Sequence, residues 1–378
     1  MLVEERIVTS KTAELTTEEV MLNLGPQHPS THGVLRLVLT LRGETVVRCE
    51  PVVGYLHRGI EKIMENRPYL AGIRYADQID YLSQMTCEHP FVLAVERLMG
   101  VEVPRRGQYL RVIADELHRI ASHLFWLGSY VNDLGAPTPI LYCLRDREVI
   151  LDHFEALGGS RFNVNFHRVG GVLQDLPAGW LQTLDPFLKK LPRNLEEYDK
   201  LVTGNEIFLA RTKNVGIISK EAALGYGLCG PCLRGSGIPF DVRSAHPYEV
   251  YDELDFVAQT DVPGDLFARY RVRVAEMHES IRLVERAIAQ LPSGPVRARV
   301  PHIVRPPKGE VYVSVESARG ELGVHLISDG TQYPYRVKFR RPSFVNLQIV
   351  SELLKGNRMG DVIAILGSLD FVLPEVDG

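Results

Sequence analysis

Cysteine is scarce in this sequence, and long apolar segments are missing from it. Its 378 residues include only five cysteines, an odd and scattered set that does not make a disulfide framework. No run free of Asp, Glu, Lys and Arg reaches the ~20 apolar residues that a membrane-spanning helix needs. The N-terminus has no apolar run of the signal-peptide kind. We therefore expect a protein of a reducing compartment, which another subunit must hold if it works at a membrane.

An excess of charge of one sign is also lacking. Lys plus Arg is 43 and Asp plus Glu is 47, a net charge of −4. Such a balance gives no electrostatic attraction to nucleic acid, so we expect no nucleic-acid partner. With 45% hydrophobic and 24% charged residues, the composition is that of an ordinary globular protein.

The period of the hydrophobic residues changes twice along the chain. Residues 21–57 alternate apolar and polar around a turn at residues 42–44, which predicts a β-hairpin. Residues 58–291 have helical spacing, and six helices are expected there, over residues 60–70, 75–99, 108–131, 146–157, 180–202 and 263–291.

The C-terminal part, residues 292–378, returns to a hairpin that turns at residues 318–321 and closes with helices over 345–354 and 361–366. We expect an N-terminal arm over residues 1–20 and a single domain over residues 21–378. The predicted fold class is α+β, with a mainly helical core and β-hairpins contributed from both ends.

Two short motifs match catalytic patterns by their letters alone. Residues 225–230 spell GxGxxG, but a helix-like segment precedes them where a dinucleotide site needs a strand. Cys229 and Cys232 spell CxxC, yet no βαβ context surrounds them, so their role stays open. We expect no nucleotide site here.

Histidines also fail to make a metal site by their spacing. His118 and His123 are five residues apart on the predicted helix, which places them on different faces. Asp115, His118 and Arg119 are interpreted as a hydrogen-bonded surface cluster rather than as metal ligands. We therefore predict that this chain holds no metal.

Several longer segments together are specific. They are LGPQHPSTHGVLRL (24–37), GYLHRGIEKIMENRPYL (54–70), IDYLSQM (79–85), YVNDLGAPTP (130–139), LRDRE (144–148), RVGGVLQDLP (168–177), ESARGELG (316–323) and RRPSFVNLQ (340–348). In this order they closely resemble the 49-kilodalton subunit of NADH:quinone oxidoreductase (respiratory complex I). The resemblance runs from about Leu22 to the C-terminus.

That family resembles the large subunit of nickel–iron hydrogenases, and the resemblance implies the same fold. The hydrogenase holds its metals with one CxxC pair early in the chain and a second at the C-terminus. Here residues 74–81 and 370–375 contain no cysteine. Because nickel and iron need thiolate ligands to be held selectively, the resemblance implies a cavity without its metals.

The resemblance implies that this cavity is a quinone-reduction chamber. By motif match, His32 in HPSTHG and Tyr81 in IDYLSQM are the donors to the quinone headgroup, and Asp133 in VNDLGA is the acid that pairs with the histidine. A carboxylate beside an imidazole raises the pKa of the histidine. A tyrosine hydroxyl donates a hydrogen bond without carrying charge.

Three further positions are implied to lie near the iron–sulphur cluster of the adjacent subunit. Gln78 and Asn163 stand where many relatives carry Arg and His, and Arg58 supplies positive charge nearby. Because cations stabilise a reduced cluster, two neutral amides predict a low cluster potential with little pH dependence.

The resemblance also implies the setting. The expected partners are the iron–sulphur small subunit, other peripheral-arm subunits and a membrane-arm subunit, at the cytoplasmic side of the cell inner membrane. No cofactor is expected on this chain alone, and quinone is the expected substrate. A ferredoxin- or deazaflavin-driven complex, a nickel–iron hydrogenase large subunit and a purely structural scaffold are the alternatives.

Overall fold

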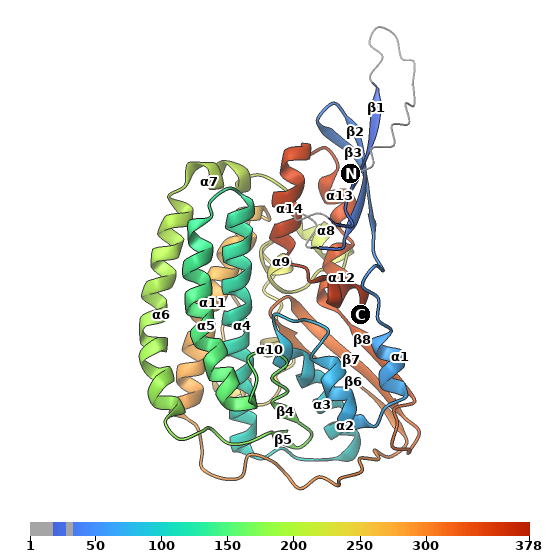
Figure 1. The fold of residues 1–378 in the computed structure, drawn as a ribbon, viewed down its shortest axis with the longest axis vertical. Helices are drawn as coiled ribbons and strands as arrows, with labels where there is room; N and C mark the ends of the chain where they lie inside the picture. Colours follow the sequence, from blue (N-terminus) through green and yellow to red (C-terminus); the bar gives the residue numbers. More distant parts are fainter. Residues whose placement is uncertain (1–17, 28–32) are drawn as a thin grey trace.

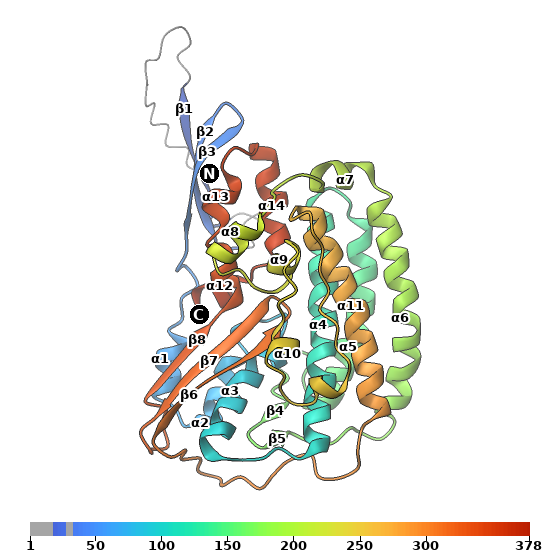
Figure 2. The ribbon, with the colours of Figure 1, turned by 180° about the vertical axis from the view of Figure 1, so that it is seen from behind.

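The computed structural model describes residues 18–27 and 33–378. Four long helices, α4, α5, α6 and α11, lie side by side on one flank, and a three-stranded sheet with shorter helices forms the other (Figure 1, Figure 2). The predicted α+β class is confirmed. Helices and turns of helix are α1 (Ile60–Glu65), α2 (Tyr69–Ala76), α3 (Gln84–Met99), α4 (Arg105–Asp133), α5 (Thr138–Gly158), α6 (Trp180–Thr203), α7 (Glu206–Thr212), α8 (Lys220–Gly225), α9 (Gly230–Arg234), α10 (Val242–Ala245), η2 (Tyr251–Glu253), α11 (Leu266–Ala289), α12 (Pro342–Leu347), α13 (Val350–Leu354), η3 (Met359–Asp361), α14 (Val362–Leu369) and α15 (Leu373–Asp377).

Antiparallel strands make up three small sheets. The strands are β1 (Glu19–Leu24), β2 (Arg36–Arg42), β3 (Thr45–Val52), β4 (His167–Arg168), β5 (Gly171–Val172), β6 (Gly309–Ser317), β7 (Gly320–Ser328) and β8 (Arg336–Arg340). Both predicted hairpins form, with Arg42 paired to Thr45 and Ser317 paired to Gly320 at their ends. β1 was not predicted: it adds to β2 and begins before residue 21, inside the segment expected to be an arm. The rest of that expected arm, residues 1–17, lies outside the described residues.

The predicted apolar stripe of α4 forms the centre of the bundle. Its members are at most 1% exposed, and they are Leu110, Ile113, Leu117, Ile120, Leu124 and Leu127. Helices α5 and α11 pack directly against α4, and α6 packs on both of them. Helical spacing therefore identified the core of this flank correctly.

The opposite face of α4 is buried as well, which corrects the predicted surface cluster. Asp115, His118 and Arg119 are each at most 3% exposed. Arg119 donates hydrogen bonds of 2.6 and 2.7 Å to the carbonyl oxygens of Glu316 and Ser317, at the end of β6. A charged group can be buried when such partners satisfy it, and these partners lie nearly 200 residues away in the sequence.

Other predicted helices are divided. The helix expected over residues 60–70 ends at Glu65, because Pro68 has no N–H group to continue it and instead precedes α2 in an extended conformation. The helix expected over residues 75–99 is interrupted by a non-helical segment, residues 77–83, between α2 and α3. Likewise, α12 and α13 replace the single helix expected over residues 345–354. None of the helices in residues 18–27 and 33–378 has both the length and the apolar character that a membrane crossing requires.

Truncating the α4 core should destabilise the fold. Leu117 is wholly buried, so Leu117→Ala should lower the free energy of unfolding by about 2–5 kcal/mol through lost apolar contact and a cavity. Leu141 on α5 is 68% exposed, and Leu141→Ala should change it by less than about 0.5 kcal/mol. Urea unfolding followed by circular dichroism measures both, and equal effects would contradict this packing.

Candidate functional site

Tyr81 lies in the short segment, residues 77–83, that separates α2 from α3. Its side chain is 44% exposed although its neighbours Asp80 and Leu82 are buried. Asp80 Oδ1 accepts a hydrogen bond of 2.9 Å from the backbone N–H of Leu82, which closes a tight turn around Tyr81. The phenol is thereby presented to solvent from a backbone that the interior holds in place.

The guanidinium of Arg319 fixes that backbone. Arg319 is wholly buried at the turn between β6 and β7, and it donates a 2.5 Å hydrogen bond to Asp80 Oδ2. It also donates to Ser122 Oγ on α4 at 3.1 Å and to Asp370 Oδ1, just after α14, at 3.4 Å. Four segments far apart in sequence therefore meet at one side chain, directly behind Tyr81.

The surroundings raise the pKa of the Tyr81 phenol. Partial burial is the main cause, and the carboxylates of Asp80 and Asp370 add to it, while the Arg319 cation opposes it. A phenol with a raised pKa stays neutral at physiological pH and acts as a hydrogen-bond donor. It releases its proton only to a group that has become strongly basic.

Arg58, Gln78 and Asn163 flank the same segment. Arg58 Nη2 donates a 2.9 Å hydrogen bond to the carbonyl oxygen of Gln78. On the other side, Gln84 in the first turn of α3 donates to Asn163 Oδ1 at 3.1 Å and accepts from the Asn163 N–H at 2.9 Å. The structure therefore gathers four of the six predicted site residues, Arg58, Gln78, Tyr81 and Asn163, along residues 78–84 or in contact with them.

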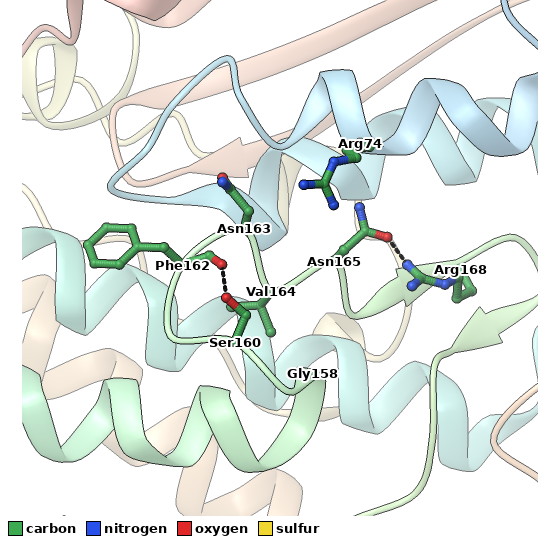
Figure 3. A pocket seen from close by; sticks show the side chains of 8 residues that line it. All are labelled: Arg74, Gly158, Ser160, Phe162, Asn163, Val164, Asn165 and Arg168. Atoms are coloured by element: carbon green, nitrogen blue, oxygen red, sulfur yellow. Dashed lines mark hydrogen bonds between the residues drawn. The ribbon is translucent and has the colours of Figure 1, made fainter.

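Asn163 also lines a pocket of about 450 Å³, here called the Asn163 pocket (Figure 3). Its lining residues are Arg74, Gly158, Ser160, Phe162, Asn163, Val164, Asn165 and Arg168. Asn163 and Asn165 both have a φ of 52°, a left-handed conformation that asparagine tolerates better than most residues. The requirement for this conformation gives a local reason for asparagine at both positions.

No sequence motif predicted that two arginines, Arg74 and Arg168, would line this pocket. Arg74 comes from α2 and Arg168 from β4, and Figure 3 shows their guanidinium groups on either side of Asn165. Arg168 is hydrogen-bonded to Asn165, which holds it in the pocket wall. Because Arg74 and Arg168 provide positive charge that the neutral Gln78 and Asn163 do not, the site is less depleted of cations than the sequence indicated.

The remaining two predicted residues are His32 and Asp133. His32 lies outside the described residues. Asp133 is the exposed last residue of α4, eleven positions beyond Ser122, which contacts Arg319. Eleven helical residues span about 16 Å, so Asp133 lies far along α4 from the contact between Ser122 and Arg319.

Cysteines and histidines are the side chains best suited to hold a metal. Cys229 and Cys232 are buried free thiols at the start of α9, and burial raises the pKa of Cys229 to about 12, which keeps it protonated. His118 packs on Phe154, while His123 binds Glu276 at 2.9 Å. Within residues 18–27 and 33–378, the ligand-bearing atoms of one group, His89, Asp115 and His167, lie within 4.8 Å of one another.

Titration of Asp77, the residue after α2, should make the free energy of unfolding depend on pH. Burial raises its pKa from 3.8 to about 6, with Arg74 opposing the shift. A carboxyl whose folded pKa is raised destabilises the fold as pH rises through the two pKa values, and the full penalty of about 3 kcal/mol is present above about pH 7. Asp77→Asn should therefore raise the free energy of unfolding by about 3 kcal/mol at pH 8 and by about half of that at pH 5.

Urea unfolding at the two pH values measures this, with Asp185→Asn as the control because Asp185 is exposed on α6. An Asp77→Asn gain that is the same at both pH values would contradict the assignment.

Comparison with known proteins gives one consistent result. The family model described as respiratory-chain NADH dehydrogenase, 49 Kd subunit, matches residues 133–308 and 299–378. A subunit of NADH-quinone oxidoreductase from Desulforamulus reducens is 52% identical over 363 residues, which cover 96% of this chain and 99% of that protein. The corresponding subunit from Geobacillus kaustophilus is 51% identical over 365 residues, 96% of this chain and 100% of that protein. On these matches the chain belongs to the family of the 49-kilodalton subunit of NADH-quinone oxidoreductase (respiratory complex I) and is a subunit of that enzyme.

Proposed function

We propose that this subunit forms part of the chamber in which quinone is reduced, beside the terminal iron–sulphur cluster of a partner subunit. The observation that carries the proposal is the placement of Tyr81, a neutral, half-exposed phenol held from behind by the buried contacts of Arg319. The relatives are named for NADH and quinone, so NADH is preferred here to ferredoxin and deazaflavin as the source of electrons.

The hydrogenase-like fold belongs to the same proposal, and the contacts of Arg319 support it. By the resemblance, residues 74–81 and 370–375 replace the two metal-binding cysteine segments of a hydrogenase. Here these segments approach each other through Asp80 and Asp370, and both carboxylates bind Arg319. The guanidinium of Arg319, held between these two carboxylates, would balance the charge that metal ions and thiolates balance in a hydrogenase. This arrangement argues against the hydrogenase alternative.

Tyr81 has the properties that the chemistry requires. Reducing a quinone to a quinol takes two electrons and two protons, one proton for each carbonyl oxygen. Tyr81 donates a hydrogen bond to one carbonyl oxygen while the quinone is oxidised. When electrons arrive from the partner's cluster that oxygen becomes far more basic, so the phenol proton moves to it even though the pKa of Tyr81 is raised.

His32 and Asp133 complete the proposal through their motif matches. His32 would serve the second carbonyl oxygen, and Asp133 would keep its imidazole charged and oriented. Arg58, Gln78 and Asn163 would lie toward the cluster of the partner subunit. Arg74 and Arg168, in the wall of the Asn163 pocket, would add positive charge that favours the reduced cluster.

The proposed partners follow from the same assignment. They are the iron–sulphur small subunit, other peripheral-arm subunits and a membrane-arm subunit, with this chain at the cytoplasmic side of the cell inner membrane. This chain would contribute the acid–base residues, while the cluster and the membrane anchor belong to other subunits. Quinone reduction would drive proton translocation in the membrane arm.

Removing the Tyr81 hydroxyl tests the proposal against a scaffold role. NADH-driven quinone reduction by membranes carrying Tyr81→Phe should fall by about 100-fold, the usual contribution of a positioned proton donor. Tyr335→Phe is the matched control, because Tyr335 is 67% exposed just before β8, and it should leave the rate unchanged. Immunoblots of purified complex check assembly. An assembled Tyr81→Phe complex with the wild-type rate would favour the scaffold.

A further inference from the structure

A wholly buried group of two histidines and one aspartate joins three elements behind the Asn163 pocket. His89 belongs to α3, Asp115 to α4 and His167 to β4, and none of the three is more than 1% exposed. We call it the His–Asp–His group. Neither the resemblance nor the proposed function uses it.

The carboxylate of Asp115 lies between the two imidazoles. His89 Nδ1 is 2.5 Å from Asp115 Oδ2, and His167 Nε2 is 3.0 Å from Asp115 Oδ1. Ligands of a tetrahedral ion with bonds of about 2.0–2.1 Å lie about 3.3 Å apart. His89 and Asp115, which are hydrogen-bonded at 2.5 Å, would therefore have to separate by about 0.8 Å to hold an ion between them.

The ring of His167 contacts Asp115 and the edge of the His89 ring. Within the described part of the chain, neither of its ring nitrogens has a well-aligned hydrogen-bond partner, and Asp115 Oδ1 has none either. Buried polar atoms without such partners are rare and costly in folded proteins. The 3.0 Å separation of His167 Nε2 and Asp115 Oδ1 is that of an ion pair, and it is also close to the separation of two ligands of one ion.

Surrounding residues provide the outer contacts of a metal site. His89 Nε2 is 2.9 Å from Glu249 Oε1, and Glu249 in turn accepts a 2.7 Å hydrogen bond from Arg111. A carboxylate on the second nitrogen of a ligand histidine fixes its tautomer and orientation, as in many zinc sites. Glu88 Oε2 accepts a 3.0 Å hydrogen bond from the backbone N–H of His167. The other carboxylate oxygen of Glu88 has no hydrogen-bond partner among the described residues.

Contrary to the prediction from histidine spacing that this chain holds no metal, we propose that His89 Nδ1, Asp115 and His167 Nε2 bind one divalent transition-metal ion, with zinc as the best fit. Two imidazoles and a carboxylate suit zinc, whereas magnesium and calcium prefer oxygen ligands alone. A four-coordinate ion would take its fourth ligand from outside these three residues. Such an ion would lock β4 to α3 and α4 and so fix the strand that carries Arg168 into the Asn163 pocket.

Metal analysis of the purified full chain tests this directly. Chain produced in zinc-supplemented medium and then gel-filtered should hold about one zinc per molecule. His167→Gln should lower the zinc content at least tenfold, while His118→Gln should retain it. His118 is the matched control because it is an equally buried histidine on α4 that is not part of the group.

A cobalt measurement on the unaltered chain covers the case in which His167→Gln does not fold. Cobalt-substituted chain should show the intense visible absorption of a tetrahedral site, and zinc should displace it. Zinc absent from the wild-type chain, or retained fully in folded His167→Gln, would overturn the proposal, as would cobalt bound only in octahedral form. Quinone reduction plays no part in these measurements, so their failure would leave the proposed function untouched.

Discussion

The buried guanidinium of Arg319 is the contact on which the arrangement of this chain depends. A charge taken out of water is costly unless its partners surround it closely, so the position of each partner is constrained in turn. Asp80, Ser122 and Asp370 satisfy Arg319 from three directions, and they belong to the segment between α2 and α3, the middle of α4 and the residue just after α14. The β6–β7 hairpin, the helical bundle and the C-terminal helices are therefore held in one relation to each other. The contact between Arg319 and Asp80 also fixes the position of Tyr81, because Tyr81 follows Asp80 directly in the chain.

Helix α4 shows why long-range burial could not be read from the sequence. Its apolar stripe has a period that is visible in one stretch of chain, and that stripe was predicted correctly. The charged residues of its other face looked like a solvated surface, because most helices have one. They are buried since Glu116 receives Arg243, Tyr251 and Ser280, all more than 120 positions away. No local sequence pattern predicts partners so distant in the chain.

The same distinction between local and long-range signals separates the turns and site residues that were predicted from those that were missed. Both hairpin turns were predicted because alternation and glycine are local signals. The break between α2 and α3 was missed, since the apolar spacing continues through it while the side chain of Asp80 turns toward Arg319, 239 positions away. Motif resemblance predicted Tyr81, Arg58, Gln78 and Asn163, which the structure places in residues 78–84 or in contact with them. Arg74 and Arg168 escaped notice, because no motif marked two arginines from separate elements as neighbours.

Charge balance explains why a tyrosine suits the exposed position 81, in front of Arg319 and its two carboxylate partners. Behind it, the carboxylates of Asp80 and Asp370 face the guanidinium of Arg319, and Arg273 Nε lies 3.6 Å from the second oxygen of Asp370. Two anions and two cations thus lie close together, and the buried carboxyl of Glu375 also interacts with Asp80 and Arg319. An added carboxylate or imidazolium at residue 81 would upset the balance of these charges, whereas a neutral phenol leaves it intact. In the proposed reaction, the proton that leaves Tyr81 offsets the negative charge brought by the electrons, so the buried ion pairs need not rearrange.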